Sequence, residues 1–438
     1  MAKNKKDLSI KTGCLMMLMA IAGSNYSFAQ QTSVVVSNPT DAQRTELIEV
    51  CMTDVKAKLN NVTPKKGEAY IVKNKRGQQI GSQITHDGKL LIDASVRPHA
   101  SATYYISIGK PYPQKVWTTG ALYKIRKDDI AWENDRCAYR VYGPALQKTG
   151  ERSFGTDVWV KNTPDTVVYD RYIKDMNGNI NGDKIDAKAK ALEKQAKAEK
   201  NQVKAAQLTG QAKALWAESR TTSFHLDHGN GLDPYRVGAT LGLGAPSLMV
   251  GKTQYLPYCY KTYKILDNGP LRFTVELAYN PSTIGDMKDV VEHRIISLDK
   301  GCNFNKMTVW YDGLTHPTDF ATGFPIHEED TETKTFAKDY VSYADPTDNQ
   351  EVNQSQVYVG VLFPNGVDNT YYQLFDQKHD GATGHALGLK NGLKNGEKYS
   401  YYFGAAWSKY DVRSYAEWQI RIKEYLEALK TPLNVELK

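Results

Sequence analysis

Hydrophobic and polar residues alternate in short runs over most of this chain, which is typical of antiparallel strands. In the first part the runs cover residues 33–36, 69–72, 90–92 and 103–108, with turn signals at 75–77 and 87–88 between them. This pattern predicts a small β-sandwich domain over residues 30–112, with a boundary at Tyr112-Pro113.

Longer runs follow in the second part, at residues 258–266, 271–279, 291–298, 306–311, 356–363 and 399–407. Several are separated only by short turn signals, so they favour a large antiparallel sandwich over a parallel α/β sheet. Residues 414–429 predict an amphipathic helix with one apolar face, made of Trp418, Ile422, Tyr425 and Leu429. We therefore predict a mainly β protein whose large domain spans residues 113–438.

Residues 183–217 interrupt the β pattern with a run rich in Ala, Lys, Glu and Gln and free of Pro. Such strong helix formers predict one long, exposed helix inserted into the large domain. A solvated insertion is the simpler interpretation, and a lid or an arm that docks polyanions is the alternative. The preceding stretch, 175–183, is similar to a calcium loop. In one register Ile180 replaces the required glycine, and in the other Lys188 replaces the bidentate acid, so we expect a polar turn instead.

Composition changes this picture little: 41% of the 438 residues are hydrophobic and 24% are charged, which excludes a collagen or a wholly disordered chain. The net charge of +7 is more informative once it is located. Residues 1–29 hold four lysines and one aspartate, and residues 183–217 hold eight lysines and four acids. The remaining β-rich part is neutral, so the charge does not indicate a nucleic-acid partner.

The first 29 residues have the features of a secretory signal peptide. Basic residues precede an apolar run at 14–22, and Ser27-Phe28-Ala29 is a suitable cleavage site before Gln30. The apolar run is far shorter than the ~20 residues that span a bilayer, so we expect a periplasmic protein without stable membrane insertion. Four cysteines remain after processing, none in a C-x-x-C pair, and we expect buried free thiols: Cys51, Cys137, Cys259 and Cys302.

Residues 223–238 form the densest group of side chains that could carry chemistry. Histidines, aspartates, a tyrosine and an arginine lie here among glycines, which let backbone approach a ligand: His225, Asp227, His228, Asp233, Tyr235 and Arg236. A histidine oriented by a carboxylate supplies a general acid or base near neutral pH, and the same groups could bind a divalent metal. A polar loop held by its own hydrogen bonds is the alternative.

A second group lies at residues 132–144. Arg136 and Arg140 could hold a carboxylate in bidentate fashion, and Tyr139 beside an arginine could serve as an acid or base. On a strand, residues 136, 138, 140 and 142 share one face and Tyr139 points away, so the arginines suit one site better than Tyr139 does. Structural ion pairs are the alternative for this group, which also contains Trp132 and Asp135.

A third group is His327 followed by Glu328, Glu329 and Asp330, which alone would be a solvated surface turn. Aromatic residues add a further indication, because 28 tyrosines stand against 11 phenylalanines. Sheet surfaces favour tyrosine, but a groove that stacks on sugar faces also uses rings with polar tips, together with tryptophans such as Trp117, Trp132, Trp159 and Trp407.

Four stretches resemble one family of exported Bacteroidetes proteins, named domain of unknown function 4861. They are WENDRCAYRVYGPAL, HLDHGNGLDPYRVGATLGLGA, NGPLR at 268–272 and the late YYFGAAWSK. The run HRIISLDKGCNFNKMTVWYDG is in addition similar to the β-supersandwich of galactose mutarotase-like and polysaccharide-lyase C-terminal domains. That second resemblance concerns the fold and says little about function.

The family resemblance implies a polysaccharide-utilisation protein that acts on oligosaccharides containing uronic acids, by an elimination that yields a 4,5-unsaturated sugar. Such a reaction needs a cation on the uronate carboxylate, a base for the C5 proton and an acid for the C4 oxygen. Arg136 and Arg140 are the candidates for the cation, and Asp227 or Asp233 for orienting a histidine or a sugar hydroxyl. His225 or His228 would fill one proton-transfer role, and Tyr139, His327 or Tyr235 the other.

Two alternatives stay open at this point. A glycoside hydrolase would use two carboxylates from Glu133, Asp135, Asp227, Asp233, Glu328 and Glu329. A non-catalytic glycan-binding module would depend on aromatic residues alone. No cofactor is expected in any of these cases, and a divalent metal stays possible.

Overall fold

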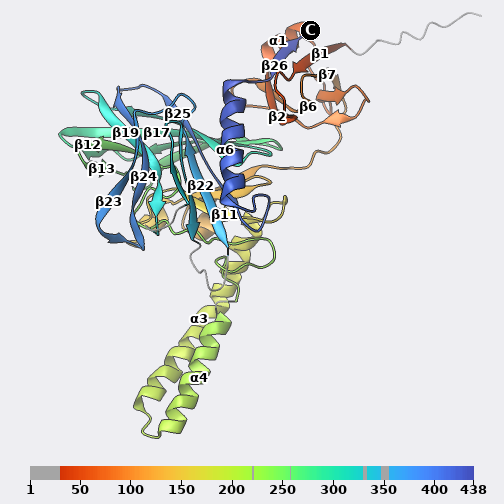
Figure 1. The fold of residues 1–438 in the computed structure, drawn as a ribbon. Coiled ribbons are helices and arrows are strands. Elements are labelled where there is room, and N and C mark those ends of the chain that lie inside the picture. Colours follow the sequence, from red (N-terminus) through yellow and green to blue (C-terminus); the bar gives the residue numbers. More distant parts are fainter. Residues whose placement is uncertain (1–29, 220, 257, 329–332, 347–354) are drawn as a thin grey trace, which may run out of the picture.

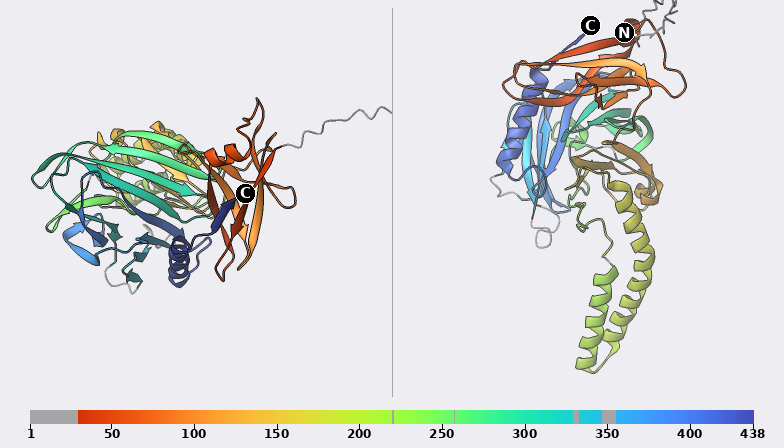
Figure 2. Two further views of the ribbon diagram at one scale, coloured as in Figure 1. Left: turned by 90° about the horizontal axis from the view of Figure 1, so that it is seen from above. Right: turned by 90° about the vertical axis from the view of Figure 1, so that its right-hand side faces the viewer.

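The computed structural model describes residues 30–219, 221–256, 258–328, 333–346 and 355–438. The predicted signal peptide, residues 1–29, lies outside the described residues. The chain forms a small β domain, a large β-sandwich beside it and a helical hairpin that projects from the far end (Figures 1 and 2). The predicted fold class is confirmed, because antiparallel sheets dominate and the helices are few.

The small domain packs two antiparallel sheets face to face. One has the strand order β26-β1-β7-β3-β4 and the other β2-β6-β5. A single apolar core, which includes Val34, Ile92 and Ile106, joins the two sheets and α1. The elements are β1 (Gln31–Ser37), β2 (Arg44–Cys51), α1 (Met52–Lys58), β3 (Ala69–Asn74), β4 (Gln79–Ile80), β5 (Ser82–Ile84), β6 (Lys89–Val96), β7 (Ser101–Gly109) and β26 (Asn434–Leu437).

The end of the chain returns to this small domain. Strand β26 pairs antiparallel with β1, and Val34 lies opposite Leu437. The sequence prediction assigned all residues from 113 to 438 to the large domain, so these last residues are a difference from it. A four-residue strand is too short for its alternation to show which sheet it joins.

The large domain contains three antiparallel sheets. The four-stranded sheet has the order β11-β10-β9-β8, the five-stranded sheet β13-β12-β19-β24-β23, and the nine-stranded sheet runs from β14 to β20. The first half consists of β8 (Thr119–Tyr123), η1 (Lys124–Arg126), β9 (Asp129–Glu133), β10 (Cys137–Val141), α2 (Pro144–Gln147), β11 (Asp157–Val160), β12 (Pro246–Val250), β13 (Thr253–Tyr255), β14 (Tyr260–Asn268), β15 (Arg272–Tyr279) and β16 (Ser282–Ile284).

The second half of the large domain consists of β17 (Met287–Asp299), β18 (Phe304–Asp312), β19 (Thr318–Ile326), β20 (Lys334–Phe336), β21 (Tyr340–Pro346), β22 (Gln356–Leu362), β23 (Asn369–His379), β24 (Ala382–Leu393) and β25 (Tyr399–Trp407). One continuous apolar core lies between the three sheets. Helix α6 (Tyr415–Lys430) lies against the outer face of the nine-stranded sheet, and Ser414 caps it by accepting a hydrogen bond from Glu417 N at 3.2 Å. Its buried face consists of Trp418, Ile422 and Leu426, so Leu426 takes the place expected for Leu429.

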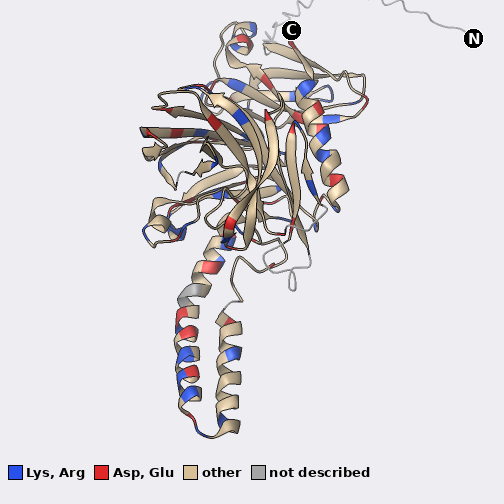
Figure 3. Ribbon diagram, turned by 60° about the vertical axis from the view of Figure 1, so that its left-hand side comes forward, with Lys and Arg blue, Asp and Glu red and all other residues tan. Residues whose placement is uncertain are grey.

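The Lys-rich insertion is helical, as predicted, but it consists of two helices and not one. Helix α3 (Val168–Ala198) and helix α4 (Gln202–Ser219) lie side by side as a hairpin (Figures 1 and 3). The chain reverses where Asn201 Oδ1 accepts hydrogen bonds from the backbone of Val203 and Lys204 at 3.0 and 3.2 Å. Asparagine is a favoured N-cap residue, so Asn201 marks the start of a second helix and the predicted single helix is divided here. The stretch 175–183, expected to be a polar turn, lies inside α3.

A buried ion pair fixes the root of the hairpin to the sandwich. Lys161 Nζ lies 2.8 Å from Glu133 Oε2, and both side chains are at most 1% exposed. The same carboxylate accepts hydrogen bonds of 2.9 Å from the backbone N–H groups of Val167 and Val168, where α3 begins. A carboxylate at a helix N-terminus satisfies unpaired N–H groups and favours the helix dipole. Glu133 therefore has a structural role and is not available for hydrolysis.

The four cysteines predicted to be free thiols are free. Cys137 and Cys259 are buried, whereas Cys51 and Cys302 are partly exposed. Within the described part of the chain, no helix has the length and apolar character needed to cross a membrane.

The Glu133–Lys161 pair yields a first prediction. Glu133→Gln leaves the Lys161 ammonium buried and unpaired, so the free energy of unfolding in urea should fall by about 3–5 kcal/mol. Adding Lys161→Met removes the buried charge and should recover part of the loss. Lys115→Ala breaks the exposed Lys115–Asp165 pair and is the control that should change stability little. A Glu133→Gln variant as stable as the parent would contradict the assignment.

Candidate functional site

The candidate site lies on the outer face of the four-stranded sheet. Strand alternation turns Ile130 and Tyr139 into the sandwich core, whereas Ala131 and Trp159 face α3 and Phe224. Arg140 lies on this outer face, directly opposite Asp157 in the pairing of β10 with β11. The sheet therefore presents charged side chains to the helix and the loop that cover it.

Arg140 is surrounded by three buried carboxylates. Its Nε lies 2.6 Å from Asp157 Oδ2, its Nη2 donates to Asp233 Oδ2 at 2.9 Å, and its Nη1 lies 3.6 Å from Asp129 Oδ2. None of the four side chains is more than 6% exposed. Rings also line the guanidinium, with its Cζ 5.0 to 5.5 Å from the centroids of Tyr142, Trp159 and Phe224.

Burial affects the pKa of Asp129 and Asp233 more than the attraction of Arg140 and Arg126 does. Burial, reinforced by repulsion from Asp157, raises the pKa of Asp233 to about 7, against the opposing attraction of Arg140. Burial likewise raises the pKa of Asp129 to about 6. Near neutral pH the cluster therefore holds a proton that ordinary aspartates would release.

His225 connects this buried cluster to solvent. Its side chain is 50% exposed, and its Nδ1 donates to the backbone carbonyl of Asp233 at 2.8 Å and lies 3.8 Å from Asp233 Oδ2. A carbonyl oxygen only accepts, so the proton of the neutral ring is on Nδ1 and Nε2 carries the lone pair. The sequence prediction that Asp233 orients a histidine thus corresponds to a contact in the structure.

The rest of the 223–235 loop is held by its own hydrogen bonds. Asp227 Oδ1 accepts from Gly229 N and Gly231 N at 2.8 and 3.0 Å, so Asp227 shapes the loop and does not orient a histidine. His228 Nε2 donates to the Ser223 carbonyl at 2.9 Å. Gly231 is required, because its φ is +98° and a Cβ there would collide with the Val160 carbonyl.

Arg126 lies beside His225 and was not among the candidates predicted from the sequence. Its Cζ lies 5.3 Å from the centroid of the Phe224 ring, whose centroid lies 4.6 Å from that of His225. Within the described chain, Arg126 Nε is buried without a hydrogen-bond partner. The next two residues, Lys127 and Asp128, have φ values of 56° and 66°, and such strain in non-glycine residues often accompanies function. An arginine among charged neighbours gave no sequence signal.

A second polar cluster lies behind the first. His327 follows β19, and its Nδ1 lies 2.6 Å from Asp345 Oδ2. Burial alone would lower the pKa of His327, but the Asp345 carboxylate raises it above its ordinary value. The Tyr235 ring lies 6.2 Å from the His327 ring, and both Tyr235 Oη and His327 Nε2 are buried without a hydrogen-bond partner among the described residues.

Tyr235 joins the two clusters. Burial raises the pKa of Tyr235 well above its usual range, and Asp345 from one cluster and Asp157 from the other raise it further. The loop thus carries Asp233, which contacts His225 and Arg140, and two residues later Tyr235, whose ring faces that of His327. Glu328 is exposed beside it, and its backbone N donates to Tyr343 Oη at 3.1 Å. Glu329 and Asp330 lie outside the described residues.

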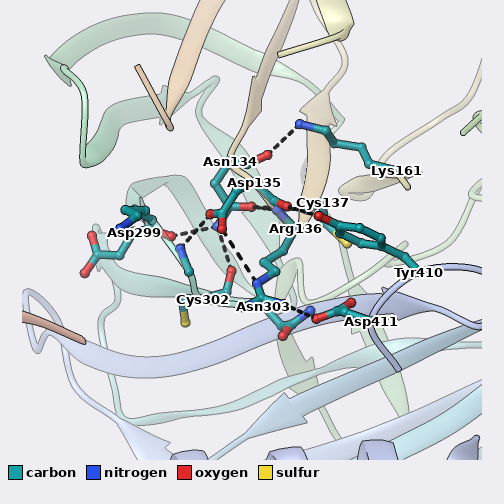
Figure 4. A network of polar contacts seen from close by, with 12 residues as sticks. Asn134, Asp135, Arg136, Cys137, Lys161, Asp299, Cys302, Asn303, Tyr410 and Asp411 are labelled. Atoms are coloured by element: carbon teal, nitrogen blue, oxygen red, sulfur yellow. Dashed lines mark hydrogen bonds and ion pairs between the residues drawn. The ribbon is translucent and has the colours of Figure 1, made fainter. Parts of the chain in front are cut away.

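Arg136 lies in a different network of contacts, contrary to expectation. It pairs with Asp411, and Asp135 Oδ2 lies 3.8 Å from its Nε (Figure 4). Asp135 Oδ1 in turn accepts from Gly301 N at 2.6 Å. At the centre is Asn134, whose amide donates to the carbonyls of Asp299 and Cys302 at 2.6 and 2.7 Å. These bonds tie the β9–β10 turn to the β17–β18 turn, so this network is structural.

Five further candidates are also in structural positions. Arg140 has its charge fully engaged by aspartates and cannot take a substrate carboxylate. Tyr139 is 1% exposed, donates to Asn303 O at 2.8 Å, and burial raises its pKa well above the usual range. Trp132 is fully buried and donates to Asn305 Oδ1 at 2.8 Å, while Trp159 and Trp407 are 1% exposed, so none of the three can stack on a sugar.

No arrangement of three or more His, Cys, Asp or Glu side chains that could hold a metal ion occurs among the described residues.

The fold and the site define an antiparallel β-sandwich protein whose buried arginine–carboxylate cluster supports a surface histidine. A family model described as a domain of unknown function (DUF4861) matches residues 36–435, and the chain belongs to this family. The "Uncharacterized protein P7" of Formosa agariphila is 24% identical over 453 residues, covering 97% of this chain and 99% of that protein.

Two solved structures from Enterococcus faecalis are also similar. One is a protein in the glycosyl hydrolase family 38, with a TM-score of 0.47 and 8% identity, and the other is an alpha-mannosidase, with 0.44 and 9%. Each match covers 93% of this chain, which spans about half of those proteins, 47% and 46% of their length. Likeness at this level carries no information about activity.

The raised pKa of Asp233 yields a prediction about stability. The native state keeps a proton up to about pH 7, whereas the unfolded chain releases it near pH 4, so this contribution is complete below about pH 4 and is lost as the pH rises toward 7. Asp233→Asn cannot titrate, so its free energy of unfolding should depend less on pH between 4 and 7. Urea unfolding of both proteins across this range tests it, and equal slopes would contradict the raised pKa.

Proposed function

We propose that this protein is a carbohydrate-active enzyme that eliminates water from a uronic acid residue of an oligosaccharide and forms a 4,5-unsaturated uronate. The observation that carries the proposal is the fixed tautomer of His225. Its Nδ1 is committed to the Asp233 carbonyl, so a basic Nε2 remains on a half-exposed ring. The resemblance of the sequence motifs to a family associated with uronate oligosaccharides supplies the substrate class.

The uronate carboxylate needs a cation before its C5 proton can be removed, because negative charge develops on that group. Arg126 takes this role in place of Arg136 and Arg140, whose charges are engaged elsewhere. Its guanidinium and the His225 ring contact the same Phe224 ring, so a carboxylate on Arg126 brings the neighbouring C5 toward His225. A planar guanidinium also suits bidentate binding of a carboxylate.

Proton transfer then proceeds through one histidine. His225 Nε2 takes the C5 proton, and the imidazolium that forms keeps its Nδ1–H hydrogen bond of 2.8 Å to the Asp233 backbone carbonyl. The same proton passes to the C4 oxygen as the C4–O bond breaks, so water leaves and the C4=C5 bond forms. Tyr235 and His327 are too buried to touch the sugar, and their role is to support the site from behind.

The hydrolytic alternative has less support from the geometry. Asp129, Asp157 and Asp233 are at most 1% exposed, and Asp227 is engaged by its own loop, so these carboxylates do not form an accessible pair. We also propose, from the signal-like first 29 residues, that the reaction takes place in the periplasm.

Incubation with uronate-ended oligosaccharides distinguishes the candidate functions. The proposal predicts a rise in ultraviolet absorbance from the new double bond without shortening of the chain. Shortening without absorbance would establish hydrolysis instead, and binding with neither change would indicate a non-catalytic module.

Substitution tests the assigned base and cation. His225→Ala should lower kcat by about 10²- to 10⁴-fold, the usual contribution of a general acid–base. Arg126→Ala should lower kcat/KM, because the developing charge loses its cation. His316→Ala is the matched control, since that histidine is also 50% exposed and near an aspartate, Asp286. If His225→Ala keeps full turnover, the assignment of the base is wrong.

A further inference from the structure

A groove of about 430 Å³ lies at the root of the helical hairpin. It is lined by residues of α3 and of the segment that leaves α4: Asp170, Ile173, Lys174, Asn177, Gly178, Asn181 and Thr222. The α3 residues recur at intervals of three or four, so they form one stripe along the helix. The volume is within the ~300–1,000 Å³ typical of ligand pockets.

The sequence of α3 at this groove is unusual for a helix. The stretch NGNING, residues 177–182, replaces the Ala, Lys and Glu of the outer hairpin with asparagine and glycine, which are poor helix formers. It is the same stretch that has the composition of a polar loop, and in the structure it is part of helix α3. Because asparagine and glycine do not stabilise a helix, their presence here calls for an explanation other than helix stability.

Gly178 allows a close contact between α3 and the segment that follows α4. A Cβ at Gly178 would collide with Thr222 Oγ1 and Cβ, so only glycine allows the returning chain to lie against α3 here. Close approach of residue 222 closes one side of the groove. Packing does not explain Asn177 and Asn181 in the same way, because both are exposed and line the groove.

The lining has the chemistry that recognises an acidic sugar. Each asparagine amide offers two donors and an acceptor, which suits pairs of neighbouring sugar hydroxyls. Asp170 accepts from hydroxyls, Lys174 supplies a cation for a carboxylate, and Ile173 gives an apolar contact for the C–H face of a ring. The chain continues from Thr222 directly into the loop of His225, so the groove adjoins the segment that carries the base.

We propose that this groove is a binding subsite for a second, acidic sugar residue of the oligosaccharide. Asn177 and Asn181 hold its hydroxyls and Lys174 its carboxylate, so the hairpin root selects oligosaccharides over monosaccharides. The inference rests on the proposed function in taking a uronate oligosaccharide as ligand. Its test is therefore a binding measurement that does not require turnover.

The test is calorimetric titration of the full chain with tetragalacturonate, with cellotetraose as the neutral probe. The double variant Asn177→Ala, Asn181→Ala should raise the Kd for tetragalacturonate at least tenfold. Alanine is the better helix former, so lost binding cannot be attributed to a damaged helix. Gln195→Ala, on the outer part of α3, is the matched control and should leave the Kd unchanged.

Charge is tested separately with two lysines of α3. Lys174→Ala should raise the Kd for tetragalacturonate several-fold more than Lys194→Ala, although both remove one positive charge. The subsite is refuted if tetragalacturonate binds no more tightly than cellotetraose, or if the double asparagine variant stays within twofold of the parent. Binding through the asparagines without any elimination would refute the proposed function and leave the subsite standing.

Discussion

Burial of the Arg140 guanidinium among three carboxylates is the constraint on which the rest of the site depends. A buried charge is tolerated only where partners and geometry compensate its loss of water. The partners come from three separate places, Asp129 on β9, Asp157 on β11 and Asp233 on the covering loop. The cluster therefore forms only when sheet and loop are assembled together. Burial, together with repulsion from Asp157, also raises the pKa of Asp233 to about 7.

That arrangement gives an exposed side chain a defined chemistry. The Asp233 backbone and carboxylate both face His225 Nδ1, so the residue that anchors the loop to Arg140 also sets the tautomer of the histidine. The hairpin is anchored just as firmly, because Glu133 binds the start of α3 and Lys161 from within the same sheet. The loop, the hairpin root and the sheet thus form one unit, although the outer hairpin is a solvated arm.

Those features of the fold and site that depend on local sequence pattern could be predicted from the sequence. Alternation located the main strands. The grouping of His225, Asp227 and Asp233 on a glycine-rich loop suggested that an aspartate orients a histidine, but it left open which aspartate does so. The prediction of one helix in place of the hairpin was wrong because a single capping residue, Asn201, stands in a run of good helix formers and gives only a weak signal. Strand alternation placed Arg140 and Tyr139 on opposite faces but could not tell which face meets the core.

The sequence could not predict contacts between residues that lie far apart in the chain, for a physical reason. Asp345 reaches His327 across strands, and Arg126 meets His225 only through the ring of Phe224. Neither relation has a fixed spacing along the chain. Arg136 looked like a ligand for anions because the aspartate that neutralises it, Asp411, is far away in the sequence.

The most direct test of the central claim is a carbon-13 NMR titration of the Asp233 side-chain carboxyl in the folded protein. The account predicts an apparent pKa near 7, and a shift toward the ordinary aspartate value when Asp157→Asn removes the repelling charge of Asp157. An Asp233 carboxyl that titrates near 4 in the parent protein would contradict the account. The cluster would then hold no proton at neutral pH, and its link to the chemistry of His225 would be lost.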